Sequence, residues 1–443
     1  MAKPVVVIGA GCAGLSAAVR LAAGGCRVLV VEQAPRLGGR ATAFTDRVTG
    51  ARVDNGQHAL FGCYRETYAF LRTLGTDGLA PLDRQLALTM ADVNGGLHRL
   101  TCPSLPAPWH LLAGALRWSA LSWGARVGLI GLRHFFDRVR RHDVEAAVEA
   151  VSPADTVHDW LRAHGQGAEV CRWLWEPLTL AALNQRMEHA SARVFARVIG
   201  ELFGGDTQAA AVGVPRVPLD ALYAEPAAGF VRDHGGEVRV RSRARLEVTP
   251  EGRLVVWADG TPVEAASVVV AAAWHALPGL WRTEPPAALR GLVAQVAAMA
   301  PEPIVTTHLW FNQPVLPARQ VGLVGTTYQW AFQGEVVSMV ASGATAVLRQ
   351  SNAELTALAV RELQACLPAA RGVEPRHAVV VREPRATFAV PPGGARRPDT
   401  RTAVRGLYLA GDWTNTGLPA TIEGAVRSGH AAADAVLGDG AGV

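Results

Sequence analysis

The sequence predicts an α/β fold built around a parallel sheet, and three observations lead to this prediction. An apolar run at Val5–Ile8 passes through closely spaced glycines into the alanine-rich stretch 13–24, as in a strand followed by a tight turn and a helix. A second buried strand is expected at 27–31, directly after that helix. Near the far end of the chain, another buried strand is expected to end at Gly411-Asp412.

The turn between the first strand and the first helix has the spacing Gly-x-Gly-x-x-Gly, which is typical of a dinucleotide site. Glycines allow the tight turn, the approach of a diphosphate and close packing of helix on strand, while unpaired N–H groups at the helix start attract the anion. The predicted cradle is Gly9, Gly11, Cys12, Ala13 and Gly14. Glu32 ends the second strand, where its carboxylate can accept both hydroxyls of an adenosine ribose. The alternative, glycines that serve only a sharp turn, is weakened by the complete strand–helix–strand setting.

Charge and cysteine usage exclude several classes of protein. The 443 residues carry 43 basic and 38 acidic side chains, and the formal charge of +5 is too small and too scattered to indicate nucleic-acid binding. The six cysteines show no Cys-x-x-Cys spacing and no histidine cluster, which argues against a metal site and a disulfide framework. The N-terminus has one positive residue and then the glycine motif in place of a signal peptide, so we expect a cytoplasmic protein.

Further motifs indicate a family. Leu37-Gly-Gly-Arg40 resembles the corresponding segment of the FAD-binding flavoproteins of the amine oxidase and phytoene desaturase superfamily. Asp54-Asn-Gly-Gln-His58 closely resembles the bacterial hydroxysqualene dehydroxylases, FAD-dependent proteins that act on a C30 isoprenoid alcohol. Arg385–Phe388 and Ala410–Gly429 carry the same resemblance, which covers essentially the whole chain.

The resemblance implies a set of FAD contacts. The backbone of Gly38 and Gly39 would run beside the diphosphate, and Arg40 would neutralise phosphate charge or contact the flavin; a solvated surface arginine is the alternative. Asp412 would bind the ribityl or diphosphate region. The remaining expected contacts are Gly56, Ala244, Gly411, Ala420, Thr421 and Ile422. The last two belong to a helix that we expect to begin near Pro419 and whose dipole faces the flavin.

Two glutamates have structural interpretations. Glu423 is interpreted as a first-turn carboxylate that complements the dipole of its own helix. Glu176 precedes Pro177 and is interpreted as a helix end, with a place in the wall or lid of an isoprenoid cavity as the alternative.

The resemblance also implies a discontinuous, amine oxidase-like domain organisation. A Rossmann-type FAD-binding domain would comprise residues 1–75, 225–275 and 385–443, and an inserted α+β substrate domain would comprise 76–224 and 276–384. The first insert is predicted to be largely helical. Expected elements of the second are strands at 304–311 and 336–341 and a helix at 353–366. Proline-rich stretches are interpreted as loops at 103–108 and 391–398.

The reaction implied by the resemblance replaces the allylic hydroxyl of hydroxysqualene by hydride from reduced FAD, giving squalene and water. Hydroxide is a poor leaving group, so an acid must protonate it as the C–O bond breaks and a stabilised carbocation forms. Asp54 is the first candidate, because a carboxyl beside an apolar cavity would hold its proton at neutral pH. His58 is the second, and Asn55 and Gln57 could orient the hydroxyl. The alternatives are a turn role for Asp54 and a structural role for His58.

Other functions stay open from the sequence. A carotenoid or phytoene desaturase would use the same scaffold to withdraw hydride from an isoprenoid, and an amine oxidase is a weaker rival. A non-catalytic FAD protein could instead present a prenyl lipid to neighbouring squalene-pathway enzymes. The direction of the flavin redox change separates these functions.

The stretch Trp109–Arg141 interleaves aromatic residues with arginines, which is the composition of a helix in a membrane interface. A pair of core helices with solvated arginines is the alternative, since the arginines do not fall on one helical face. No charge-free apolar run is long enough to span a bilayer. With a C30 lipid as substrate, we expect peripheral attachment to the inner face of the cytoplasmic membrane.

Overall fold

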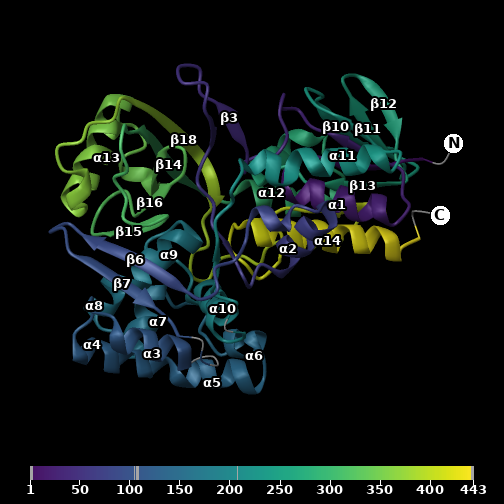
Figure 1. The fold of residues 1–443 in the computed structure, drawn as a ribbon. Coiled ribbons are helices and arrows are strands. Elements are labelled where there is room, and N and C mark those ends of the chain that lie inside the picture. Colours follow the sequence, from purple (N-terminus) through teal and green to yellow (C-terminus); the bar gives the residue numbers. More distant parts are fainter. Residues whose placement is uncertain (1–2, 104, 106–108, 207, 441–443) are drawn as a thin grey trace.

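The computed structural model describes residues 3–103, 105, 109–206 and 208–440. Figure 1 shows three packed parts: a parallel sheet with its helices near both ends of the chain, a mixed sheet beside it, and a helical part below. The α/β class predicted from the sequence is confirmed.

The parallel sheet has five strands. In spatial order they are β19 (Leu407–Leu409), β13 (Ser267–Val270), β1 (Val5–Ile8), β2 (Val28–Val31) and β9 (Glu237–Arg239). Each neighbouring pair is parallel, and Val6 lies opposite Leu29 on one side and Val268 on the other. The central strands are almost entirely valine, leucine and isoleucine because both faces of a parallel sheet are covered.

The first and last long helices of the chain pack against each other on this sheet. Helix α1 (Cys12–Ala23) contacts both α14 (Ile422–Gly438) and α11 (Glu225–Asp233), and ten of its twelve residues are buried. A Cβ on Gly429 would lie 2.2 Å from the carbonyl oxygen of Ala13, so only glycine lets α14 approach this closely. The two ends of the sequence therefore form one packed layer.

Strands of the parallel sheet come from each of the three segments predicted to bind FAD, whereas the exact boundaries of those segments stay a prediction. The same segments form β3 (Ala43–Thr45), β4 (Arg52–Asp54), β5 (Leu60–Phe61), α2 (Arg65–Leu74), β10 (Ala244–Val248), β11 (Leu254–Ala258) and β12 (Thr261–Glu264). Strands β10 to β12 form a separate antiparallel sheet, and β5 pairs with β8 (Val212–Gly213).

The mixed sheet has seven strands. Their order is β18 (His377–Phe388), β14 (Pro301–Trp310), β17 (Val337–Ser342), β16 (Trp330–Gln333), β15 (Gln320–Val324), β6 (Ala87–Asp92) and β7 (Leu97–Thr101). Only β15 and β6 are parallel neighbours. Helix α13 (Asn352–Cys366) covers one face through a buried apolar core, and α12 (Arg290–Ala297) precedes β14. The strands and the helix expected in the second insert are confirmed.

The first insert is largely helical, as predicted, but near its beginning a short 3-10 turn η1 (Asp77–Leu79) is followed by two strands that were not predicted. Strands β6 and β7 form a hairpin around Asn94-Gly95, a dipeptide that favours tight hairpin turns, and they extend the mixed sheet. Apart from the short strand β8, the other elements described here are helices: α3 (Trp109–Arg117), α4 (Trp123–Gly128), η2 (Leu129–Leu132), α5 (Arg133–Arg141), α6 (Val144–Glu149), α7 (Val157–Ala163), α8 (Ala168–Val170), α9 (Glu176–Leu183) and α10 (Ala192–Phe203).

Two prolines sit inside continuous helical runs, which corrects the interpretation of Glu176 as a helix end. The π-helical turn η3 (Cys171–Trp175) leads directly into α9, so Pro177 is carried within the run. The π-helical turn η4 (Asp220–Ala224) leads into α11 and Pro226 in the same way. Proline lacks the N–H that an α-helix needs, and a wider turn before it accommodates the missing bond.

The last helix begins later than the sequence predicted. Thr421 is the N-cap of α14, and its Oγ1 accepts the N–H of Gly424 at 3.0 Å. The expected start near Pro419 is therefore too early, because the helix begins after Thr421, whose side chain caps it. The proline-rich loop at 391–398 is confirmed, whereas most of the loop expected at 103–108 lies outside the described residues.

Candidate functional site

Two glycine-containing loops meet at the N-terminus of α1. The N–H of Gly38 donates to the carbonyl oxygen of Ala10 at 2.9 Å, and Gly38 forms a β-bridge with Gly11. A Cβ on Gly14 would lie 1.9 Å from the carbonyl oxygen of Gly9, so the helix can start this close to the turn only with glycine there. The first N–H groups of α1 have no partner within the helix. The structure thus brings the two predicted glycine segments together in an arrangement that suits a diphosphate.

Glu32 lies beside this turn, at the carboxyl end of β2. Its Oε2 accepts the N–H of Ala10 at 2.8 Å, and its Oε1 accepts the N–H of Ala34 at 2.7 Å. Each oxygen keeps a second lone pair, so a carboxylate fixed in this way can still accept ribose hydroxyls. Cys12 and Ala13 are buried in the first turn of α1, and burial raises the pKa of the Cys12 thiol to about 11, which keeps it neutral.

A cluster of charges faces the same region from the other side. Arg40 pairs with the buried carboxylate of Asp412 at 2.7 Å, donates to the carbonyl oxygen of Ala386 at 2.7 Å and lies over the ring of Trp274. The guanidinium of Arg397 donates to the backbone oxygen of Asp412 at 3.0 Å, and burial lowers its pKa to about 10. Two guanidinium groups thus contact Asp412, one at its carboxylate and one at its backbone oxygen, and the excess positive charge fits the diphosphate of FAD.

The loop that carries Asp412 is held by α14. The N–H of Gly411 donates to Oγ of Ser428, which lies six residues after the first residue of α14, at 2.8 Å. Ala420, Thr421 and Ile422 form the N-terminal end of the same helix, where N–H groups and the helix dipole favour negative charge. The predicted contacts from the C-terminal motif therefore sit together at one helix start.

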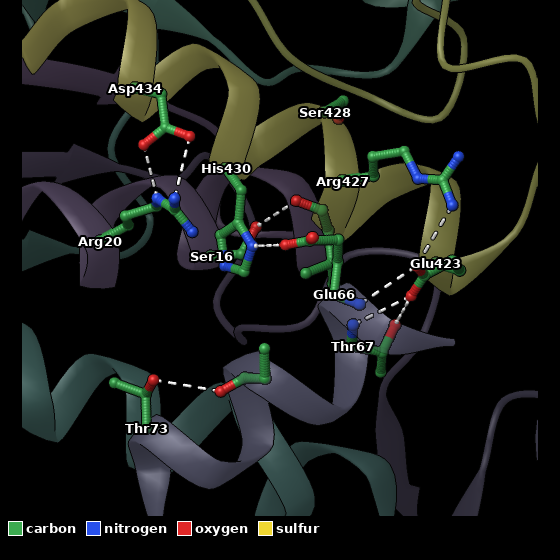
Figure 2. A network of polar contacts seen from close by, with 12 residues as sticks. Ser16, Arg20, Glu66, Thr67, Thr73, Glu423, Arg427, Ser428, His430 and Asp434 are labelled. Carbon is green, nitrogen blue, oxygen red and sulfur yellow. Dashed lines mark hydrogen bonds and ion pairs between the residues drawn. The ribbon is translucent and has the colours of Figure 1, made fainter. Parts of the chain in front are cut away.

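Glu423 lies in the first turn of α14, as predicted, and it also has a second role that the sequence did not indicate. Its buried carboxylate accepts the N–H of Glu66 at 3.1 Å, and the N–H and hydroxyl of Thr67 at 2.9 and 2.8 Å (Figure 2). It therefore caps the N-terminus of α2 from α14. Glu66 in turn pairs with His430 of α14 at 2.6 Å, which adds a second tie between the two helices.

The loop 54–58 is attached to the second glycine segment through Asn55. The side-chain amide of Asn55 donates to the carbonyl oxygen of Arg40 at 2.5 Å. The backbone N–H of Asn55 donates to the carbonyl oxygen of Thr42 at 2.9 Å. Behind the loop lies β14 of the mixed sheet, where a Cβ on Gly56 would lie 3.6 Å from the hydroxyl oxygen of Thr306. Asn55 is thus a positioning residue, and the loop is enclosed between the glycine segment and the sheet.

Asp54 is a half-buried carboxyl that points towards the first insert. Its Oδ1 accepts the N–H of Leu219 at 2.9 Å, and the loop itself is shaped by Asn55. Arg52, on the same side of β4, pairs with Asp220 next to Leu219. Burial raises the pKa of Asp54 to about 7, the Leu219 N–H opposes the rise, and the charge of Asp220 adds to it. Asp54 can therefore hold a proton near neutral pH.

His58 is better suited to accept a hydrogen bond than to supply a proton. Its Nδ1–H donates to the carbonyl oxygen of Gly56 at 2.7 Å, and burial lowers its pKa. The ring is therefore neutral at pH 7 and keeps a lone pair on Nε2. Gln57 lies between Gly56 and His58 and is half-buried.

Several residues at this site were not identified from the sequence. The hydroxyl of Tyr223 contacts the carbonyl oxygens of Gly38 and Ala41 at 2.7 Å each, and Arg397 acts as described above. No local pattern marks these residues, because their partners lie far away in the chain. Ala244 lies at the start of β10, where it pairs with Ala258, and its contact with adenine stays a prediction.

The described part of the chain lacks two other kinds of feature. No group of three or more histidine, cysteine, aspartate or glutamate residues there could hold a metal ion. No helix there is both long and apolar enough to cross a bilayer.

Comparison with known proteins identifies the family. The model of the flavin-containing amine oxidoreductases matches residues 12–437. A hydroxysqualene dehydroxylase from Rhodopseudomonas palustris is 31% identical, covering 99% of this chain and 100% of that protein, and one from Sinorhizobium fredii is 30% identical, covering 99% of both. A zeta-carotene desaturase from Zea mays is 25% identical, covering 98% of this chain and 84% of its own.

Solved structures show the same fold. A putrescine oxidase variant superposes with a TM-score of 0.73 at 16% identity, and cyclohexylamine oxidase from Brevibacterium oxydans with a TM-score of 0.71 at 19% identity; each match covers 99% of both chains. These identities are low enough that the likeness speaks for the fold alone. Together with the family match and the diphosphate cradle, it shows that the chain belongs to the flavin-containing amine oxidoreductase family and is an FAD-dependent oxidoreductase.

Proposed function

We propose that the protein is a hydroxysqualene dehydroxylase, which replaces the allylic hydroxyl of hydroxysqualene by hydrogen and releases squalene and water. Bound reduced FAD would supply the hydride. The observation that carries the proposal is the full-length similarity to two hydroxysqualene dehydroxylases. Asp54 supports it as a half-buried carboxyl at the start of loop 54–58 whose pKa is raised by burial, because this reaction needs an acid and removal of hydride from a saturated carbon does not.

The residues of loop 54–58 have distinct roles in this proposal. Asp54 delivers its proton to the departing hydroxyl, and the N–H of Leu219 stabilises the carboxylate that this leaves behind. The Nε2 lone pair of neutral His58 accepts a hydrogen bond from the substrate hydroxyl and orients it, with Gln57 as a further polar contact. Asn55 holds the loop against Arg40.

A desaturase is the second candidate, because zeta-carotene desaturases also match nearly the whole chain. The two reactions move hydride in opposite directions. Purified protein should be reduced without oxygen and mixed with hydroxysqualene; the proposal expects reoxidised flavin and one squalene per flavin. Oxidised protein mixed with phytoene should keep its flavin spectrum. Bleaching by phytoene would identify a desaturase, and no redox change with either lipid would identify a lipid-presenting FAD protein that serves neighbouring squalene-pathway enzymes.

We also propose that the protein works at the inner face of the cytoplasmic membrane. A C30 isoprenoid alcohol dissolves in lipid, so the enzyme must take its substrate from a bilayer and return its product there. The interfacial composition of residues 109–141 supports this location.

A further inference from the structure

The helical part carries large apolar side chains on its surface. In α3, α4 and η2 these are Trp109, Leu116, Trp123, Val127 and Ile130, with exposed fractions of 56, 40, 71, 60 and 43%. Single exposed apolar residues are ordinary in proteins, but these five fall within residues 109–130. We call them the apolar face.

Helical spacing places these side chains on outward stripes. Trp123, Val127 and Ile130 follow the i, i+4, i+7 pattern of one helix face across α4 and η2. Trp109 and Leu116 are seven residues apart on α3, so they also share a face. An amphipathic surface helix normally turns such a stripe towards the core. Here the stripes point to the outside, while other residues of the same helices make the internal contacts.

One arginine joins the two helices. The guanidinium of Arg126 donates to the carbonyl oxygens of Leu116 and Trp118 at 2.8 Å each, and lies 4.9 Å from the ring centre of Trp123. It therefore fixes the start of α4 against the end of α3. This link keeps α3 and α4 in a fixed position relative to each other.

The stretch of chain that carries the apolar face is strongly positive, and one carboxylate from elsewhere, Glu169, accepts the N–H and hydroxyl of Ser122 at the start of α4. Residues 105–142 contain six arginines and a single acidic residue, Asp137. The exposed arginines in this stretch are Arg117, Arg133, Arg138, Arg140 and Arg141. Asp137 is already paired with Arg140. Such an excess of positive charge beside exposed aromatic and aliphatic side chains complements an anionic lipid headgroup layer.

We propose that the apolar face docks the protein on an anionic bilayer, with α3 and α4 lying in the plane of the interface. Helix α3 has nine residues, about 14 Å in length, which is less than half of a hydrocarbon core. Figure 1 places α3 and α4 at the outer end of the helical part, away from the parallel sheet and both chain ends. The inference rests on the proposed function for the reason to meet a membrane.

The same helices connect this face to the inside of the molecule. Trp118, at the end of α3, is fully buried and packs edge-on against Trp173, which also contacts His98 of β7. The rings of Trp118 and Trp173 therefore lie between this end of α3 and β7 of the mixed sheet.

The test is vesicle binding by the purified full-length holoprotein. We expect it to sediment with vesicles of phosphatidylcholine mixed with phosphatidylglycerol. The double variant Trp123→Ser, Val127→Ser should bind about tenfold or more weakly, because each side chain loses most of its transfer free energy. The matched control Val48→Ser changes a side chain that is 75% exposed on the β3–β4 hairpin, and it should bind within twofold of wild type.

Arginine variants provide a second test in the same vesicle assay. Arg138→Gln together with Arg141→Gln should weaken binding to the anionic vesicles and leave binding to pure phosphatidylcholine unchanged. Wild-type binding that survives the apolar double variant would overturn the proposal. So would a concentration-dependent dimer that this variant abolishes, which would make the face a contact between copies. Binding uses no substrate, so loss of dehydroxylation with intact vesicle binding would refute only the proposed function.

Discussion

Replacing Asp54 by asparagine separates the role of a proton donor from that of a structural acceptor. The amide oxygen of asparagine can still accept the N–H of Leu219, which Asp54 holds at 2.9 Å, but the side chain has no acidic proton. If Asp54 protonates the departing hydroxyl, the rate of a single turnover with hydroxysqualene should fall by about 10²–10⁴-fold, or roughly 3–5 kcal/mol of barrier. The flavin content should not change.

The same substitution should raise the stability of the folded protein at alkaline pH. The pKa of Asp54 is raised from 3.8 to about 7 in the folded state, so the ionised carboxylate costs free energy there. If the whole pKa shift acted on stability, the variant would gain about 4 kcal/mol in the free energy of unfolding. We expect a gain of about 1–2 kcal/mol, because the group is partly solvated. Wild-type stability should fall as the pH rises through this window. The gain of the variant is therefore complete above about pH 7 and vanishes below about pH 4.

Two measurements on the same samples test this reasoning. Stopped-flow absorbance follows flavin oxidation by hydroxysqualene, and urea unfolding at several pH values gives the free energy of unfolding. Asp233→Asn is the matched control, since Asp233 is exposed on α11 and should change neither quantity. A variant that turns over within a few-fold of wild type, without a pH-dependent gain in stability, would show that Asp54 is an ordinary structural carboxylate.

Three other predictions follow from the cofactor site and its support. FAD should be released by acid precipitation, and Glu32→Ala should bind it at least tenfold more weakly in equilibrium dialysis; a full flavin complement in that variant would contradict the ribose contact. Glu423→Ala should lower the free energy of unfolding by about 2–4 kcal/mol because two N–H groups and a hydroxyl lose their buried acceptor, whereas Glu423→Gln should lose less; equal urea midpoints would disprove the capping role. Gly429→Val should prevent α14 from packing on α1 and lower the yield of folded, yellow protein; a normal yield and urea midpoint would argue against the close approach.

The parts of the fold that could be predicted are those with a local cause. The first strand, glycine turn and helix are encoded within twenty residues, and the structure has them at Val5–Ile8 and Cys12–Ala23. The expected strands and helix of the second insert also match, because their apolar runs have the periods of strand and helix. The hairpin of β6 and β7 was missed although Asn94-Gly95 signals it, since the aromatic and helical composition of the surrounding insert dominated the interpretation.

The parts that could not be predicted depend on partners far away in the chain. In the sequence Glu423 looks like any first-turn glutamate. Its partner Thr67, at the N-terminus of α2, is 356 positions away in the chain and is brought to it only by the fold. Pro177 and Pro226 look like helix boundaries until a π-helical turn carries the helix past each of them. The direction of the Asp54 side chain follows from the pairing of β4 with β3 and the packing of residues 219–220, neither of which has a local signal.

These distant contacts also determine which substitution at Asp54 is informative. Leu219 and Tyr223 are four residues apart at the π-helical turn η4, which leads into α11. Their side chains therefore lie on one face of this turn. Leu219 donates to Asp54, while the hydroxyl of Tyr223 holds the carbonyl oxygens of Gly38 and Ala41 in the glycine segment of the FAD site. Alanine at position 54 would release Leu219 and, through this shared face, disturb the glycine segment. A loss of activity in the alanine variant could then come either from lost FAD or from the lost proton donor. Asparagine keeps the hydrogen bond to Leu219 and removes only the proton.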